Sequence, residues 1–185
     1  MKPYYRVRIS GLAVGAPQEP NDMNAMTNAF AGVGIKPKRE PVTPWNPSRR
    51  AIKRVTNPLP APTVCPHCGS EVKIVRNSEI YNGQEYGEWP WAYKCDGNFC
   101  DAYVGMHPFT NIPLGTLATH AMRDARKRAK AVFNPLWKEG GMTRDEAYAW
   151  LAARLGIAVA ETHIGWFDVP MCDRVIGIVK NRSKT

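Results

Sequence analysis

Four of the five cysteines in this chain of 185 residues come as two close pairs. Cys65 and Cys68 belong to a Cys-Pro-His-Cys-Gly segment, and Cys95 and Cys100 form a C-x4-C pair. Two thiolates at such spacing can bind one ion, because a tight turn points both sulfurs the same way, and Gly69 favours that turn. The pattern therefore predicts a tetrahedral Zn²⁺ site with four sulfur ligands.

A zinc site of this kind is closed, so the predicted role of the metal is structural, with no coordination position left for a catalytic water. Four alternatives stay open: buried free thiols, an iron–sulfur cluster, and ligation by His67 or, in place of Cys100, by His107. Because no secretory signal precedes the cysteines, metal binding is favoured over disulfides. Cys172 stands alone and is expected to be a small buried apolar residue.

The residues between the two pairs predict a β-hairpin that returns the second pair to the first. Strand-like patterns cover residues 71–76 and 89–94, and Asn82-Gly83 marks a turn. A third short strand is expected at 103–107. Three helices should follow, the first over about 117–133 with Thr116 as its N-cap.

The second helix has the clearest boundaries, a capping box at 143–146 and Gly156 at its end. The third is expected to start at Asp168, with Pro170 in its first turn. The residues expected in the core are Trp137, Tyr148, Trp150, Leu151, Leu155, Ile164, Phe167, Val175 and Ile176.

The fold class is therefore α+β: a small zinc-stabilised β-hairpin, of zinc-ribbon or treble-clef type, packed against three C-terminal helices. Such a module buries little apolar surface, so metal binding should contribute directly to folding.

Positive charge is concentrated near the start of the chain. Of the net charge of +9, residues 1–64 carry +7, and nine of the sixteen prolines lie between Pro17 and Pro62. This predicts a basic, proline-rich arm over 1–63, joined to a zinc-finger and helical domain over 64–185. Within the arm we expect a strand at 4–9, a helix over 21–35, and no regular helix between 36 and 63.

The excess charge favours a nucleic acid or an acidic protein surface as partner. On the first helix the basic residues fall within an arc of about 100° opposite an alanine-rich face. The candidate nucleic-acid contacts, in the arm and on this helix, are Arg49, Arg50, Lys53, Arg54, Arg123, Arg126, Lys127 and Lys130.

The sequence thus predicts a non-catalytic zinc-binding protein that binds nucleic acid, and no HExxH, GxSxG or P-loop motif points to an enzyme. One alternative is a protein-interaction factor that docks on a host protein such as the transcription machinery. A second is a metal-dependent nuclease, which needs an open metal site. No stretch approaches the roughly 18 apolar residues that a membrane helix needs, so we expect no membrane association. We also expect a cytoplasmic location. The sequence indicates no oligomeric state.

From about residue 64 to 180 the chain resembles a family of small, functionally uncharacterised zinc-finger-containing proteins of bacteria and their phages. The sequence words that carry the resemblance are CPHCG at 65–69, CDAYVGMH at 100–107, PLGTLA at 113–118, FNPLW at 133–137, EAYAWLA at 146–152 and THIGWFD at 162–168. The chain differs by Asn98-Phe99, which lengthen the second cysteine pair, and by Met106, where the family often has another cysteine. The resemblance implies a zinc module with helices and a phage or prophage setting, and it supplies no activity.

Overall fold

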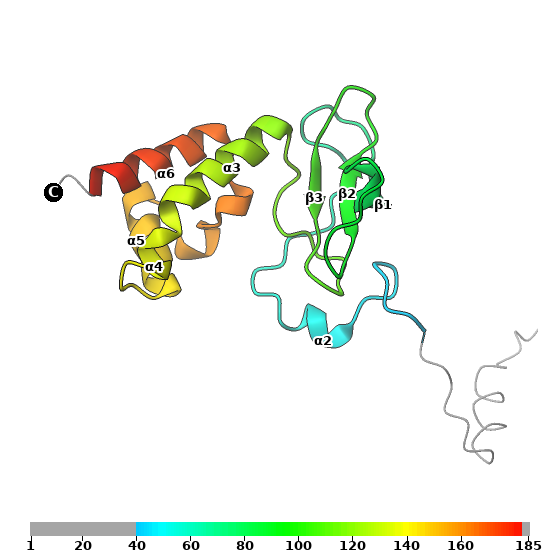
Figure 1. Cartoon of the computed structure of the whole chain (residues 1–185), viewed down its shortest axis with the longest axis horizontal. Helices are drawn as coiled ribbons and strands as arrows, with labels where there is room; N and C mark the ends of the chain where they lie inside the picture. Colours follow the sequence, from blue (N-terminus) through cyan, green and yellow to red (C-terminus); the bar gives the residue numbers. More distant parts are fainter. Residues whose placement is uncertain (1–39, 183–185) are drawn as a thin grey trace, which may run out of the picture. The chain divides into compact units, whose positions relative to one another are not determined.

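A three-stranded sheet and a group of helices make up residues 40–182, the part of the chain that the computed structural model describes (Figure 1). The strand expected at 4–9 and the helix expected at 21–35 lie outside these residues. None of the helices within residues 40–182 is long and apolar enough to cross a membrane.

The sheet is antiparallel and has the order β1-β2-β3. Its strands are β1 (Val72–Arg76), β2 (Trp91–Cys95) and β3 (Tyr103–Gly105). The register places Cys95 opposite Val72, so the end of β2 lies beside the start of β1 and the first cysteine pair. The predicted hairpin and third strand are therefore confirmed, and the hairpin register delivers the second cysteine pair to the first.

A compact loop joins β1 to β2. It contains the short 3₁₀ helix η1 (Asn77–Glu79), and Asn82 and Gly83 both take positive φ angles, of 52° and 89°. β2 begins only after Pro90, because proline has no N–H to donate to a neighbouring strand.

The first long helix, α3 (His120–Phe133), begins three residues later than expected, and its N-cap is Thr119 rather than Thr116. The reason is a backbone bridge: Ala118 exchanges two hydrogen bonds with Tyr103 and so belongs to the sheet edge. The short helix α4 (Pro135–Lys138) follows directly, since Pro135 can start a helix but cannot continue one.

The last two long helices follow the sequence closely. α5 (Arg144–Leu155) has the predicted capping box at Thr143 and ends at Gly156, which has a φ of 72°. The 3₁₀ helices η2 (Val159–Glu161) and η3 (Ile164–Trp166) lead to α6 (Val169–Arg182). Asp168 caps α6, because its Oδ1 accepts a hydrogen bond from the backbone N–H of Met171.

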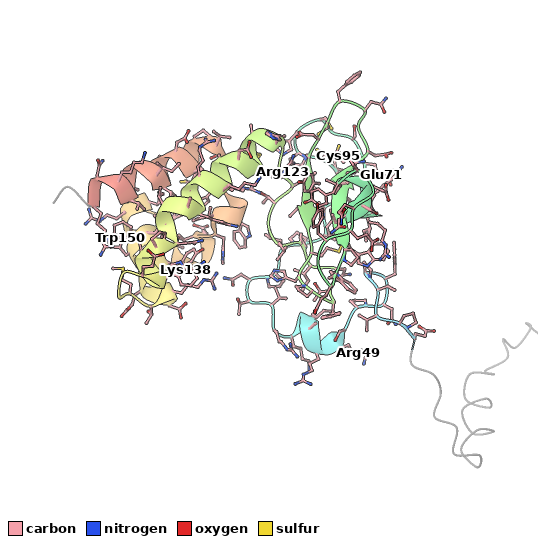
Figure 2. All side chains as sticks on the ribbon, viewed as in Figure 1. Arg49, Glu71, Cys95, Arg123, Lys138 and Trp150 are labelled. Carbon is pink, nitrogen blue, oxygen red and sulfur yellow. The ribbon has the colours of Figure 1, made fainter. Side chains whose placement is uncertain are left out.

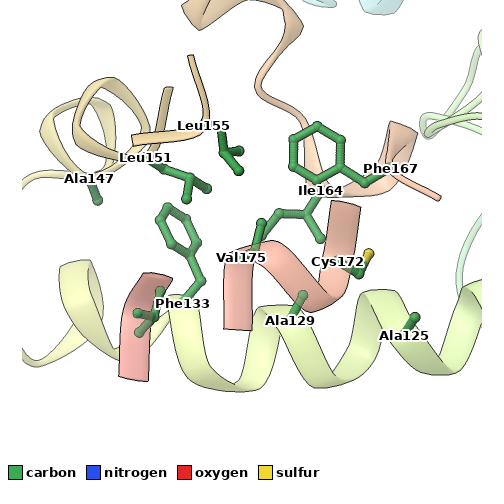
Figure 3. Close-up of a cluster of buried hydrophobic side chains, with 11 residues drawn as sticks. Ala125, Ala129, Phe133, Ala147, Leu151, Leu155, Ile164, Phe167, Cys172 and Val175 are labelled. Carbon is green, nitrogen blue, oxygen red and sulfur yellow. The ribbon is translucent and has the colours of Figure 1, made fainter. Parts of the chain in front are cut away.

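The helices share one apolar core, shown in Figure 3. Small residues on α3, Ala125 and Ala129, face α6, where Cys172 and Val175 are fully buried. The expectation for Cys172 is thus confirmed. Of the predicted core residues, Leu151, Leu155, Ile164, Phe167 and Val175 are buried, whereas Trp137, Tyr148, Trp150 and Ile176 are only partly buried against them.

Residues 40–63 belong to the same compact unit as the rest of the described chain. Ser48 donates its backbone N–H to the carbonyl oxygen of Phe109 at 2.9 Å, and the rings of Trp45 and Trp91 meet edge to face with centroids 5.2 Å apart. The expectation of no regular helix in this segment is wrong over one turn, α2 (Arg49–Ile52). A turn forms there because no proline interrupts the residues after Ser48, whose Oγ caps it.

Gly115 and Gly165 provide a direct test of the packing. A Cβ on Gly115 would lie 2.3 Å from the carbonyl oxygen of Gly165, so Gly115→Ala must separate the two segments. We expect this variant to lose about 1–3 kcal/mol of unfolding free energy. A Cβ on Gly177, in α6, would meet nothing within 4 Å, so Gly177→Ala should gain about 0.5–1 kcal/mol. Urea unfolding followed by circular dichroism measures both, and equal stability of Gly115→Ala and the parent chain would contradict the close approach.

Candidate metal centre

The sulfurs of Cys65, Cys68, Cys95 and Cys100 all lie within 4.8 Å of one another. Cys68 Sγ is 3.3 Å from Cys95 Sγ, and Cys65 Sγ is 3.7 Å from Cys100 Sγ. In a tetrahedral site with Zn–S bonds of about 2.3 Å, neighbouring sulfurs are about 3.8 Å apart. The four thiols therefore fit the ligand set and the size of a tetrahedral zinc site.

Backbone hydrogen bonds shape the first cysteine turn. Cys65 donates its N–H to the carbonyl oxygen of Ser70 at 2.8 Å, and Gly69 donates to the carbonyl oxygen of Cys65 at 2.9 Å. Gly69 has a φ of 76°, which residues with a Cβ rarely adopt. The glycine after the second cysteine is thus required by the turn, as the sequence indicated.

The second turn accommodates the longer C-x4-C spacing. Cys100 donates its N–H to the carbonyl oxygen of Gly97 at 3.0 Å, while Gly97 donates its own N–H to Cys95 Sγ at 3.3 Å. Asn98 and Phe99 form the tip of this turn, and the Phe99 side chain is fully exposed. Because the two extra residues point outward, Cys100 still reaches the other sulfurs.

The two turns hold thiols of different acidity. Hydrogen bonds from Ser70 lower the pKa of Cys68 to about 6, whereas burial raises the pKa of Cys95 to about 12. At neutral pH and without metal, Cys68 is therefore ionised and Cys95 is protonated. A metal ion that binds all four sulfurs must displace the proton of Cys95.

Neither histidine considered from the sequence belongs to the cluster, which consists of cysteines alone within residues 40–182. His67 Nε2 instead lies 3.1 Å from the carbonyl oxygen of Leu117. His107 is partly buried away from the sulfurs, and desolvation lowers its pKa.

The second cysteine turn also supports the first long helix. Asp101 Oδ2 accepts hydrogen bonds from the backbone N–H of His120 at 2.7 Å and from Arg123 Nη2 at 3.0 Å. The Arg123 guanidinium lies over the ring of Tyr103, 3.9 Å from its centroid. Displacing Cys100 would thus move the residue that fixes the start of α3.

Arg126, which the sequence analysis named as a candidate nucleic-acid contact, is buried. Its Nε donates to the carbonyl oxygen of Phe167 at 2.8 Å, and its Nη1 and Nη2 donate to the carbonyl oxygen and Oγ1 of Thr116. The guanidinium joins the connection before α3 to the segment before α6. Arg126 is therefore unavailable to a nucleic acid, and Arg123, whose side chain is only 19% exposed, is largely so.

The other six candidate cations lie at the surface. Lys127 and Lys130 are exposed on α3, and Lys127 pairs with Asp124 at 3.6 Å. Four basic residues are exposed in and just after α2, and we call them the basic turn: Arg49, Arg50, Lys53 and Arg54.

A small sheet with two cysteine turns that converge on one point, joined to a helical unit, defines a metal-binding protein of the zinc-finger type. The family model described as a zinc-finger-containing domain matches residues 61–182, and the chain belongs to this family. The resemblance stated from the sequence is thereby confirmed. Comparison with curated proteins and with solved structures gives no match.

Replacing one ligand tests the site. Cys95→Ser should weaken zinc binding by at least about 100-fold, because even partners that only orient a ligand contribute 10- to 100-fold. Cys172→Ala, which removes the one cysteine outside the cluster, should keep the zinc content of the parent chain. Elemental analysis and a chelator competition measure both. Unchanged affinity in Cys95→Ser would contradict the assignment.

The pH dependence of zinc affinity should have two slopes, because metal and protons compete for the thiolates. Cys95, with a pKa of about 12, releases its proton on binding throughout the range from pH 5 to 8 and contributes about a tenfold loss per unit of falling pH. Cys68, with a pKa of about 6, adds to that loss only below pH 6. The plot of log affinity against pH should therefore be steeper below pH 6 than above pH 7. A competition titration at each pH measures the slopes, and equal slopes would contradict an ionised Cys68.

Proposed function

We propose that this protein binds Zn²⁺ through Cys65, Cys68, Cys95 and Cys100 and, without catalysing a reaction, binds nucleic acid through the basic turn. The proposal rests on the exposure and the ion pairing of the four cations in the basic turn. All are exposed within six residues, and none forms an ion pair with any residue in the described part of the chain. Figure 2 labels Arg49 on the α2 turn.

The basic turn is suited to phosphate contacts because its backbone is already fixed. Ser48 caps the turn and is bonded to Phe109, so little conformational entropy remains to be lost on binding. Lysine and arginine side chains on such a turn can neutralise successive phosphates and release counterions.

An aromatic ring accompanies the cations. Trp45 precedes the turn by four residues, and 67% of its surface is exposed although its ring edge contacts Trp91. Exposed aromatic rings beside basic residues support stacking of unpaired bases. This combination favours a single-stranded nucleic acid over a duplex.

Fewer residues of α3 can contact a nucleic acid than the sequence suggested. Lys127 and Lys130 extend the cationic surface, whereas the guanidinium groups of Arg123 and Arg126 are used inside the protein. The zinc ion would contribute rigidity: it fixes the sheet against which residues 40–63 lie.

A protein-interaction role remains the second proposal, because Phe99 is a fully exposed apolar side chain at the tip of a metal-supported turn. The basic turn would then meet an acidic host protein. The cytoplasmic location and the phage or prophage setting stay predictions, as does the nuclease alternative.

Neutralising the basic turn tests the proposed function. A variant with Arg49→Gln, Arg50→Gln, Lys53→Gln and Arg54→Gln should bind a labelled single-stranded 20-mer more weakly. If all four side chains contact phosphates, the slope of log affinity against log salt should become less steep by about 3, at about 0.7 for each contact. Fluorescence anisotropy between 50 and 300 mM salt measures both quantities.

The matched control removes the same charge from the helical part, with Lys138→Gln, Arg154→Gln, Lys180→Gln and Arg182→Gln. It should keep most of the affinity and the slope. Equal losses of affinity in the two variants would mean that binding depends only on the net charge of the protein. Unchanged affinity after neutralisation of the basic turn would refute the proposed surface. Recovery of one acidic protein after nuclease treatment, with no oligonucleotide binding, would favour the second proposal.

A further inference from the structure

A cavity of about 450 Å³ lies among α3, α4, α5 and the segment that contains η3, away from the cysteine cluster. Part of its wall is aromatic, formed by Trp137, Tyr148, His163 and Trp166. His163 and Trp166 lie ring against ring with centroids 4.1 Å apart. The size falls within the usual range for small-molecule sites, about 300–1,000 Å³.

Two cations from different helices complete the lining. Lys130 comes from α3 and Arg144 from the first turn of α5, and both are exposed. Neither forms an ion pair with another residue of the described chain. The Arg144 guanidinium instead lies 5.2 Å from the centroid of the Tyr148 ring.

The charge of the lining selects the ligand. No carboxylate lines this cavity within residues 40–182, so a cationic guest would meet two like charges and no opposite charge. A planar anion, in contrast, can place its ring along the aromatic walls and its charge near Lys130 and Arg144.

Two polar groups in the lining are unused. The indole Nε1 of Trp137 is buried and has no hydrogen-bond partner in the described chain, which is unusual for a buried donor. The side-chain amide of Asn134 also forms no hydrogen bond there. The Asn134 amide offers a donor and an acceptor of the kind that the edge of a nucleobase requires, whereas Trp137 Nε1 has no accessible surface and could reach a ligand only after its ring moves.

We propose that this cavity binds a nucleotide, with its base against the aromatic walls and its phosphate between Lys130 and Arg144. The proposal does not rest on the function proposed above, because no residue of the basic turn lines the cavity; of the cationic surface proposed there, only Lys130 belongs to both. It also gives a role to four sequence words that the metal site leaves unexplained, since PLGTLA, FNPLW, EAYAWLA and THIGWFD each supply lining residues.

The nucleotide has two chemical sources, a free mononucleotide or one residue of a single strand. A second cavity of about 470 Å³ shares Arg144, Tyr148 and His163 with the first. Asp145 contributes a carboxylate to its lining beside Arg144, and its size leaves room for a neighbouring nucleotide, so the test includes both sources.

Calorimetric titration of the zinc-loaded full chain tests the proposal. The probes are adenosine and uridine 5′-monophosphates, the matching nucleosides, inorganic phosphate, and a 5′-phosphorylated trinucleotide. Saturable binding of a nucleotide, weaker for the nucleoside and for phosphate alone, is expected. Binding of the mononucleotides identifies a free ligand, and binding of the trinucleotide alone identifies a strand; both support the proposal.

The double variant Lys130→Gln, Arg144→Gln changes only exposed side chains and should weaken nucleotide binding by about tenfold or more. The matched control, Arg128→Gln with Arg154→Gln, removes the same charge from the same two helices outside the cavity and should bind as the parent does. The indole N–H signal of Trp137, assigned by Trp137→Phe, should shift on titration in nuclear magnetic resonance spectra.

Failure to bind any nucleotide probe would overturn the proposal, as would equal affinities of the double variant and the parent. If neutralising the basic turn abolishes nucleotide binding while the double variant binds as the parent does, the ligand belongs to that turn instead. In that case the inference fails while the proposed function stands.

Discussion

The structure depends on the convergence of four sulfurs from two turns. The sheet beneath them has only three short strands, and its core contains eight buried residues, two of which are the ligand candidates Cys65 and Cys95. So small a core buries too little apolar surface to offset the conformational entropy of its loops. Bonds from one metal ion to both turns would close the hairpin and supply the missing free energy of folding.

Polar contacts carry this constraint into the helices. Asp101, next to Cys100, accepts a hydrogen bond from the first residue of α3 and binds Arg123, and Arg126 joins Thr116 to the carbonyl oxygen of Phe167. Arginine suits these positions because its planar group donates several hydrogen bonds at once while its stem packs on apolar neighbours. The same use removes Arg126, and largely Arg123, from the exterior, so the accessible cations among the candidate nucleic-acid contacts are those of the basic turn together with Lys127 and Lys130 on α3.

The sequence predicted correctly the features that depend on residues close together in the chain. The cysteine spacing gave the ligand candidates, and the Thr143 capping box and Gly156 gave the bounds of α5, because each depends on residues a few positions apart. The start of α3 was misplaced because a distant residue, Tyr103, pairs with Ala118. Burial of Arg126 was missed for the same reason, since its partners lie 10 and 41 positions away. The cavity lined by Trp137, Tyr148, His163 and Trp166 was not predicted, because its lining residues come from four segments that are separate in the sequence.

Ligation of one metal ion by sulfur alone can be measured by X-ray absorption spectroscopy at the zinc edge of the purified full chain, because this method counts and identifies the atoms bound to the ion. We expect four sulfur neighbours at about 2.3 Å and no nitrogen or oxygen bound to the ion. Bound imidazole nitrogen or water oxygen, or a folded chain that holds no zinc, would contradict this expectation.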